Sequence, residues 1–205
     1  MSASYAILLD GGFVRIKLSG HGRGHVDAAG ISAFTRHVQA LPCLAGMRLH
    51  RVYFYDSKPL EAKEAVPLGG GSIDFSVTEA ATRNRLLHTA LVREPFFALR
   101  FGELAMEGWR VQPKVLRKAG PTVEISAVDL KPNIRQKGVD MRIGLDIASL
   151  TLKKHVEVIV LVTGDSDFIP AMKFARRWAR QLGGPARHEI IGVRGSFHGR
   201  TMGSL

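Results

Sequence analysis

The stretch EVIVLVTGDSDF, residues 157–168, joins an apolar run to two aspartates that stand close together. Its first part, residues 157–163, is almost entirely apolar and mostly β-branched, which predicts a strand buried on both faces of a parallel sheet. Asp165 and Asp167 come directly after that strand. In open α/β sheets, ligands bind beyond the carboxyl ends of the strands, so this stretch predicts a ligand site at that edge.

The first strand expected in the chain ends in a similar way. Residues 5–10, YAILLD, predict a short buried strand that a pair of glycines stops and that ends in Asp10. If this strand and the 157–163 strand are neighbours in a parallel sheet, Asp10, Asp165 and Asp167 meet on one rim. The sequence therefore predicts a group of carboxylates rather than isolated acids.

Strands and helices alternate along the rest of the chain, which predicts an α/β fold with a mainly parallel sheet. The 205 residues suit one core, so we expect a single domain over residues 1–205. Residues 58–75 hold two prolines and three consecutive glycines and are expected to form a loop, whereas residues 96–118 are expected to form a pair of strands around Gly102–Gly108. Asp56 is interpreted as a turn residue. Further strands are expected at 48–57 and 188–193, and helices at 26–41, 78–92, 138–154 and 169–182.

The chain is strongly basic. It has 29 lysines and arginines against 18 acidic residues, a formal net charge of +11, which favours nucleic acid or an anionic membrane surface as a partner. Between residues 170 and 200, seven basic residues stand against one acid, Glu189, as expected of a surface that contacts a phosphate backbone. A solvated basic surface without a partner is the alternative. The seven are Lys173, Arg176, Arg177, Arg180, Arg187, Arg194 and Arg200.

Cysteine content and hydropathy limit the class of protein further. No apolar run approaches the ~18 residues of a membrane-spanning helix, and the N-terminus lacks the pattern of a signal peptide. The single cysteine, Cys43, excludes an intrachain disulfide and is interpreted as a small buried apolar residue. A lone cysteine is typical of a reducing compartment, so we expect the cytoplasm.

A fourth aspartate, Asp140, stands in the first turn of the helix that leads into the 157–163 strand. Carboxylates that gather in one place raise each other's pKa values unless a cation intervenes. Mg²⁺ or Mn²⁺ would remove this conflict, because these ions take oxygen ligands and need only a few carboxylates. The histidines and the single cysteine show no zinc-binding spacing. An acidic pocket with such an ion, surrounded by arginines, is suited to the hydrolysis of phosphodiester bonds.

Each of these residues also has a purely structural interpretation. Asp10 is compatible with a turn residue, Asp165 or Asp167 with a helix N-cap, and Asp140 with a favourable charge at a helix N-terminus. Asp146 faces away from Asp140 on an ideal helix, where pairing with an arginine is the alternative to a role in the site. The candidate phosphate-binding side chains are equally compatible with solvated surface: Lys137, Arg176, Arg177 and Arg180.

Three stretches together resemble the NYN domain family of PIN-like nucleases, especially its bacterial LabA-like branch. They are AILLDGG at 6–12, KGVDMRIGLDIA at 137–148 and VIVLVTGDSDFIPAMKFAR at 158–176. The resemblance implies a Rossmann-like three-layer α/β/α sandwich, an acidic Mg²⁺ or Mn²⁺ site and RNA cleavage. It implies a catalytic and metal-binding role for Asp10, Asp140, Asp165 and Asp167. Asp146 is a further candidate metal ligand, and Lys137 lies in the matching motif.

The chain departs from this family at one position. The family commonly has an asparagine a few positions after its first aspartate, whereas this chain has Phe13 and no asparagine before Asn84. If that asparagine orients the metal or its water, this chain binds metal differently or cleaves slowly. Residues 58–75 and 96–118 are further candidates for branch-specific additions.

We therefore expect a cytoplasmic bacterial ribonuclease that depends on Mg²⁺ or Mn²⁺ and contacts RNA through Lys137, Arg176, Arg177 and Arg180. The alternative is a PIN-like module that binds RNA or a regulatory protein without cutting. A homodimer is a further candidate assembly. A third possibility is a phosphatase for small phosphate esters. Phosphatases that use aspartates for catalysis usually carry a DxD motif at the end of the first strand. The DGG of this chain lacks that motif.

Overall fold

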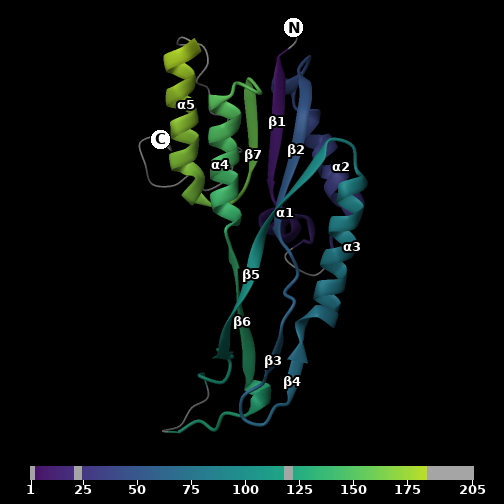
Figure 1. The fold of residues 1–205 in the computed structure, drawn as a ribbon, viewed down its shortest axis with the longest axis vertical. Helices are drawn as coiled ribbons and strands as arrows, with labels where there is room; N and C mark the ends of the chain where they lie inside the picture. The colour runs from purple at the N-terminus through teal and green to yellow at the C-terminus, as the bar shows by residue number, and fades with distance from the viewer. Residues whose placement is uncertain (1–2, 21–24, 118–121, 184–205) are drawn as a thin grey trace.

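The computed structural model describes residues 3–20, 25–117 and 122–183 (Figure 1). The expected strand at 188–193 lies outside these residues, as do Arg187, Arg194 and Arg200. Within the described residues, strands and helices alternate as the sequence predicts, and the fold is α/β.

A five-stranded, mainly parallel sheet in the order β6–β5–β2–β1–β7 forms the centre of the fold. β1 (Ser4–Asp10) lies between β2 (Arg48–Ser57) and β7 (Val158–Val162) and is parallel to both. β2 also pairs in parallel with β5 (Phe97–Val111), and β6 (Leu130–Lys137) runs antiparallel to β5. Because β1 and β7 are parallel neighbours, Asp10 and the loop after Val162 share one edge of the sheet, as expected.

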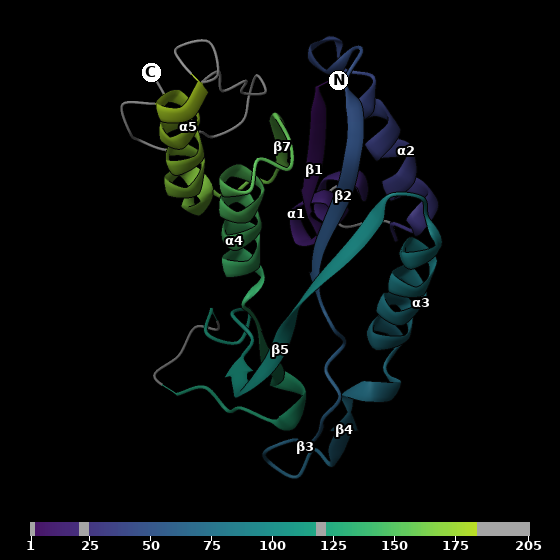
Figure 2. The ribbon, with the colours of Figure 1, turned by 45° about the horizontal axis from the view of Figure 1, so that its top comes forward.

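Helices cover both faces of the sheet, which makes a three-layer α/β/α sandwich (Figures 1 and 2). The side chains of β1 alternate between two cores: Ile7 and Leu9 pack toward α1, α2 and α3, and Ala6 and Leu8 pack toward α4 and α5. All four side chains are fully buried, as the period of two in a central strand requires. The helices are α1 (Gly11–Leu18), α2 (Ala28–Gln39), α3 (Glu79–Arg93), α4 (Val139–Leu152) and α5 (Ile169–Gly183).

The helix α1 is absent from the sequence prediction, which took Gly11 and Gly12 as the end of a strand and the start of a turn. The Asp10 side chain caps α1, and the helix runs directly out of β1. Gly11 serves close packing: a Cβ at this position would lie 2.5 Å from the carbonyl oxygen of Tyr55 and 2.8 Å from the ring of Phe54. The glycine therefore marks a close approach of α1 to β2 rather than a turn.

The expected pair of strands in residues 96–118 is one long strand, β5. Its first part pairs with β2 and its second part pairs with β6, so the strand continues past the edge of the parallel sheet. Gly102 lies where a Cβ would collide with Lys137 and Val139, and Gly108 has a φ of +90° beside a register shift. The two glycines thus mark a close approach and a bulge, and neither forms the turn of a hairpin.

The expected loop at 58–75 contains a short antiparallel hairpin, β3 (Lys63–Ala65) and β4 (Ser72–Asp74). A Cβ on Gly70 would lie 2.7 Å from the Cβ of Ala127, so the hairpin packs against the connection that leads into β6. The connecting 3-10 turns are η1 (Pro42–Leu44), η2 (Phe75–Val77), η3 (Ala127–Asp129) and η4 (Ser166–Phe168).

Two smaller features complete the description. Cys43, in η1, is exposed, so its interpretation as a buried residue is wrong. Over the described ranges, none of the helices has the length and apolar character needed to span a bilayer.

Candidate functional site

Asp10 links the first helix of the chain to the loop after β7. Its Oδ1 accepts a hydrogen bond from the backbone N–H of Phe13 at 3.2 Å and thereby caps α1. Its Oδ2 accepts a hydrogen bond from the hydroxyl of Thr163 at 3.0 Å. One carboxylate therefore joins the carboxyl end of β1 to the residue that follows β7.

Thr163 also positions the second pair of aspartates. Its Oγ1 accepts a hydrogen bond from the backbone N–H of Asp165 at 3.1 Å. Asp165 Oδ1 in turn accepts from the backbone N–H of Asp167 at 2.9 Å and caps η4. Both aspartates are exposed at the edge of the sheet. Sequence reasoning missed Thr163, although a hydroxyl between a strand and an aspartate is a recognisable signal for such a link.

Asp140 lies in the first turn of α4, next to the N-cap Gly138, which has a φ of +79°. Partial burial raises the pKa of the Asp140 carboxyl, and the negative charges of Asp165, Asp10 and Asp167 raise it further. The four aspartates predicted from the sequence therefore share one electrostatic environment, although they come from three separate parts of the chain.

A glycine and an aromatic ring hold the loop between Thr163 and Asp165. A Cβ on Gly164 would lie 2.5 and 2.6 Å from the ring atoms Cε2 and Cδ2 of Phe13. Phe13 is partly buried against the core below α1, and the ammonium group of Lys17 lies 5.6 Å from its ring centroid. The Phe13 ring is therefore an apolar support for the aspartate loop.

Asp146 is held by two partners on the neighbouring strands. Its Oδ2 accepts hydrogen bonds from the Tyr55 hydroxyl at 2.8 Å and from Arg100 Nε at 3.0 Å. Burial first, and then the hydrogen bond to Asp146, raises the pKa of Tyr55. Asp146 is not among the charges that raise the pKa of Asp140. The structure contains the pairing of Asp146 with an arginine, which was one of the two alternatives for this residue. A role for Asp146 as a metal ligand stays a prediction.

The candidate RNA-binding residues fall into two groups. The ammonium group of Lys137 lies 2.8 Å from Glu107 Oε1, and the guanidinium of Arg135 lies 2.9 Å from the other oxygen of that carboxylate. The hydrogen bond from Lys137 is the main cause that lowers the pKa of Glu107. On α5, Arg177 is exposed, so it is free to reach a ligand in solvent.

The other two arginines of α5 differ from each other. Arg180 is exposed, as is Arg177, which lies three residues earlier on the same helix. Arg176 is half-buried, and its Nε is buried without a hydrogen-bond partner among the described residues. The basic surface of α5 is therefore formed by Arg177 and Arg180 more than by Arg176, and RNA contact by all three stays a prediction.

A buried polar network beside this site was not foreseen. Asp56 is 2% exposed and accepts hydrogen bonds from Arg15 at 3.1 Å and from His88 at 2.9 Å. Its Oδ1 also accepts from the backbone N–H of Ser57, and Arg15 donates to Asn84 Oδ1 at 2.8 Å. The interpretation of Asp56 as a turn residue is wrong, because Asp56 lies within β2 and its buried carboxylate connects this strand to α1 and α3.

The donor set of the four aspartates fits a hard divalent cation. Carboxylate oxygens are the ligands that Mg²⁺ and Mn²⁺ prefer, and a cation would offset the burial and the negative charges that raise the pKa of Asp140. No three carboxylate, histidine or cysteine groups of the described ranges stand close enough to form a ready-made metal site. Mg²⁺ keeps several waters and is commonly bound through one or two carboxylates and substrate phosphates, so the fit does not require such a group.

Three comparisons with known proteins found similarities. The model of the NYN domain matches residues 88–188, which include Asp140, Asp165 and Asp167. A segment of 57 residues is 44% identical to an ornithine aminotransferase of Exiguobacterium; it makes up 27% of this chain and spans only 14% of that relative. A crystal structure of a protein of unknown function from Vibrio parahaemolyticus aligns with 86% of this chain and 75% of its own, with 14% identity and a TM-score of 0.46. Residues 88–188 therefore match the NYN domain, which is a domain of the PIN-like superfamily.

Proposed function

We propose that this protein is a metal-dependent ribonuclease that hydrolyses phosphodiester bonds of RNA. The observation that carries the proposal is the gathering of four aspartates: Asp10 is tied to Thr163 at the carboxyl ends of β1 and β7, and Asp165 and Asp167 follow it. Partial burial and the charges of these three aspartates raise the pKa of Asp140. A protein that only binds a polyanion gains nothing from four acids in one place, whereas a divalent cation makes use of them. The NYN domain match supports a nuclease of the PIN-like type.

Asp10, Asp140, Asp165 and Asp167 would hold Mg²⁺ or Mn²⁺ at the edge of the sheet. When bound, the ion supplies an activated water and stabilises negative charge on the leaving oxygen. The hydrogen bonds of Asp10 to Thr163 and of Asp165 to Asp167 orient these carboxylates before the ion arrives. The exposed Arg177 and Arg180 would bind the phosphate backbone of the strand. We also propose a cytoplasmic location, which the single cysteine supports.

The test of this function is a comparison of substrates and ions. Labelled single-stranded RNA, single-stranded DNA of the same sequence and a chromogenic phosphate ester are incubated with the protein in Mn²⁺, Mg²⁺ or EDTA. The proposal expects cleavage of RNA in at least one of the two ions and none in EDTA. Turnover of the phosphate ester without cleavage of RNA would assign the site to a phosphatase instead.

One observation favours a second candidate, a module that binds RNA without cutting. The contact of Phe13 with Gly164 leaves an apolar ring where the family commonly has a polar side chain. Salt-sensitive binding of RNA without cleavage in either ion would support this candidate, since backbone contacts alone give that dependence on salt.

The Phe13–Gly164 contact leads to a prediction about the aspartate loop. Gly164→Ala places a methyl group against the Phe13 ring, so the ring or the loop must move. A displacement of about 1 Å at a reacting group is expected to lower the rate of RNA cleavage by roughly 10- to 100-fold. The measurement is the single-turnover cleavage rate in Mn²⁺.

The control for this prediction is Gly144→Ala in α4, where a Cβ would meet nothing within 4 Å. This variant is expected to cleave normally and to unfold at a slightly higher temperature, because alanine favours the helix by about 0.5–1 kcal/mol over glycine. The double variant Phe13→Leu/Gly164→Ala is expected to regain part of the lost rate. A Gly164→Ala variant as fast as the wild type would show that this contact does not position Asp165.

A further inference from the structure

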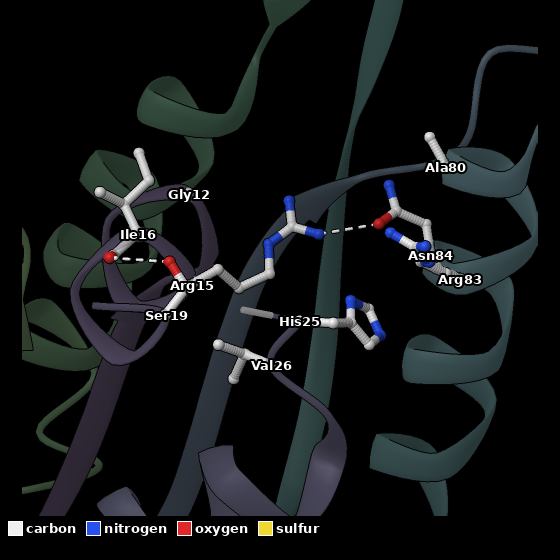
Figure 3. Close-up of a pocket in the computed structure, with 9 residues that line it drawn as sticks. All are labelled: Gly12, Arg15, Ile16, Ser19, His25, Val26, Ala80, Arg83 and Asn84. Carbon is white, nitrogen blue, oxygen red and sulfur yellow. Dashed lines mark hydrogen bonds between the residues drawn. The ribbon is translucent and has the colours of Figure 1, made fainter. Parts of the chain in front are cut away.

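A cavity lies between α1 and α3 (Figure 3). Its volume is about 380 Å³. The polar side chains that line it are Arg15 and Ser19 from the α1 region, His25 before α2, and Arg83 and Asn84 from α3. Neither the aspartate site nor the surface of α5 includes any of them.

The cavity presents hydrogen-bond donors that the protein itself holds in place. Arg15 donates to the Gly11 carbonyl, to Asn84 Oδ1 and to Asp56, so its guanidinium is fixed in one orientation. A guanidinium has no acceptor, so the carbonyl oxygen of Asn84 must face Arg15, which leaves the amide N–H groups of Asn84 for another partner. Fixed donors of this kind suit an anion with several oxygens.

Arg83 adds a cation that a ligand can recruit. Its partner is Glu79, one turn earlier on α3, in a pair whose side chains are 47% and 75% exposed. Exposed pairs of this kind are weak, so a phosphate that enters the cavity competes readily for the Arg83 guanidinium. The bidentate geometry of arginine matches the oxygens of a phosphate group.

The cavity and the aspartates share the first turn of α1. Gly12 lines the cavity, and a Cβ on Gly12 would lie 3.4 Å from Asp10 Oδ1. Gly12 therefore belongs both to the lining of the cavity and to the surroundings of the Asp10 carboxylate.

We propose that the cavity between α1 and α3 binds a phosphate group of the RNA strand through Arg15, Arg83 and Asn84. That the phosphate belongs to RNA rests on the function proposed above. That the cavity binds a phosphate group does not. The phosphate is either an internal phosphodiester or a terminal 5′-phosphate, and both present the oxygens that these donors recognise.

The test measures RNA affinity without cleavage, so that it does not depend on nuclease activity. Fluorescence anisotropy in EDTA is recorded for a labelled oligoribonucleotide with a 5′-phosphate and for the same oligoribonucleotide with a 5′-hydroxyl. Arg83→Gln is compared with Arg85→Gln, which removes the same charge from the same helix but lies outside the cavity and donates to the Ser76 carbonyl. Asn84→Asp is the second variant, because it keeps the acceptor for Arg15 and replaces the amide donors with a negative charge.

Arg83→Gln is expected to bind RNA about 5- to 10-fold more weakly than Arg85→Gln and to reduce the salt dependence by about one phosphate contact. Asn84→Asp is expected to lose at least as much RNA affinity as Arg83→Gln. A loss with both oligoribonucleotides assigns the cavity to an internal phosphodiester, and a loss confined to the 5′-phosphate form assigns it to a strand end. Equal affinities of the two arginine variants, or no RNA binding by the wild type, would overturn the proposal. If the wild type does not cleave RNA but Arg83→Gln still weakens RNA binding, the proposed nuclease function is wrong and the proposed phosphate site is retained.

Discussion

Asp140→Asn is expected to lower metal-dependent RNA cleavage by at least about 100-fold, since a bound metal supplies several kcal/mol of stabilisation to the transition state. The same variant is expected to unfold at an equal or higher temperature than the wild type in EDTA. The physical reason is the raised pKa of Asp140, which partial burial and the charges of Asp165, Asp10 and Asp167 cause. An amide in this place removes one of four repelling charges. Cleavage rates in Mn²⁺ and thermal unfolding in EDTA check the two halves of the prediction.

The pH dependence of the stability difference follows from the direction of that shift. The folded protein holds the Asp140 proton more tightly than the unfolded chain, whose carboxyl has a pKa near the ordinary 3.8. The wild type therefore loses stability relative to the variant as the pH rises from that value through the raised pKa. At a pH below the ordinary value both side chains are neutral, and the advantage of the variant is expected to vanish. An Asp140→Asn protein that unfolds more easily at neutral pH would show that this carboxylate stabilises the fold instead.

Asp56→Ala is expected to cause the largest loss of stability among the substitutions considered. It leaves Arg15 and the buried His88 without the carboxylate that pairs with both. Removal of one partner from a buried ion pair costs about 3–5 kcal/mol; because the Arg15 side chain is 29% exposed, we expect a value near the lower end, about 3 kcal/mol. Chemical denaturation monitored by circular dichroism measures this loss of free energy of unfolding.

The matched control for Asp56 is Glu79, which pairs with Arg83 on the exposed surface of α3. Glu79→Ala is expected to change the free energy of unfolding by less than about 1 kcal/mol, because solvent already screens that pair. If Asp56→Ala were as stable as Glu79→Ala, the network of Arg15, Asp56 and His88 would have no structural role. The comparison distinguishes a buried carboxylate that connects β2, α1 and α3 from a surface ion pair within α3.

The meeting of Asp10, Asp165 and Asp167 at one edge of the sheet could be predicted from the sequence, because it depends on rules that act locally. The strand at 157–163 and the strand at 5–10 both have continuous apolar runs, and parallel neighbours end at one edge. Only the next step, the convergence of Asp140 from α4, required the fold itself to be known. Its placement follows from the packing of α4 on the face of the sheet that Ala6 and Leu8 share.

The helix α1 and the long strand β5 were mispredicted for one physical reason. Both segments contain glycines, and local rules take glycine as a signal for a turn. Here Gly11 and Gly102 are needed because another element approaches too closely for a Cβ, which depends on residues far away in the chain. The role of Asp56 was missed for the same reason, because its partners Arg15 and His88 come from other elements.

The most direct test of the account is the cleavage of labelled single-stranded RNA in Mn²⁺ by the wild type and by Asp165→Asn, with Mn²⁺ binding measured on both proteins. The asparagine keeps the side-chain oxygen that accepts from Asp167 N–H, so the η4 cap and the fold are retained. If the aspartates hold the metal, the wild type cleaves RNA and the variant loses both cleavage and Mn²⁺ affinity. A variant that cuts RNA as fast as the wild type would contradict the assignment of the four aspartates to a metal centre.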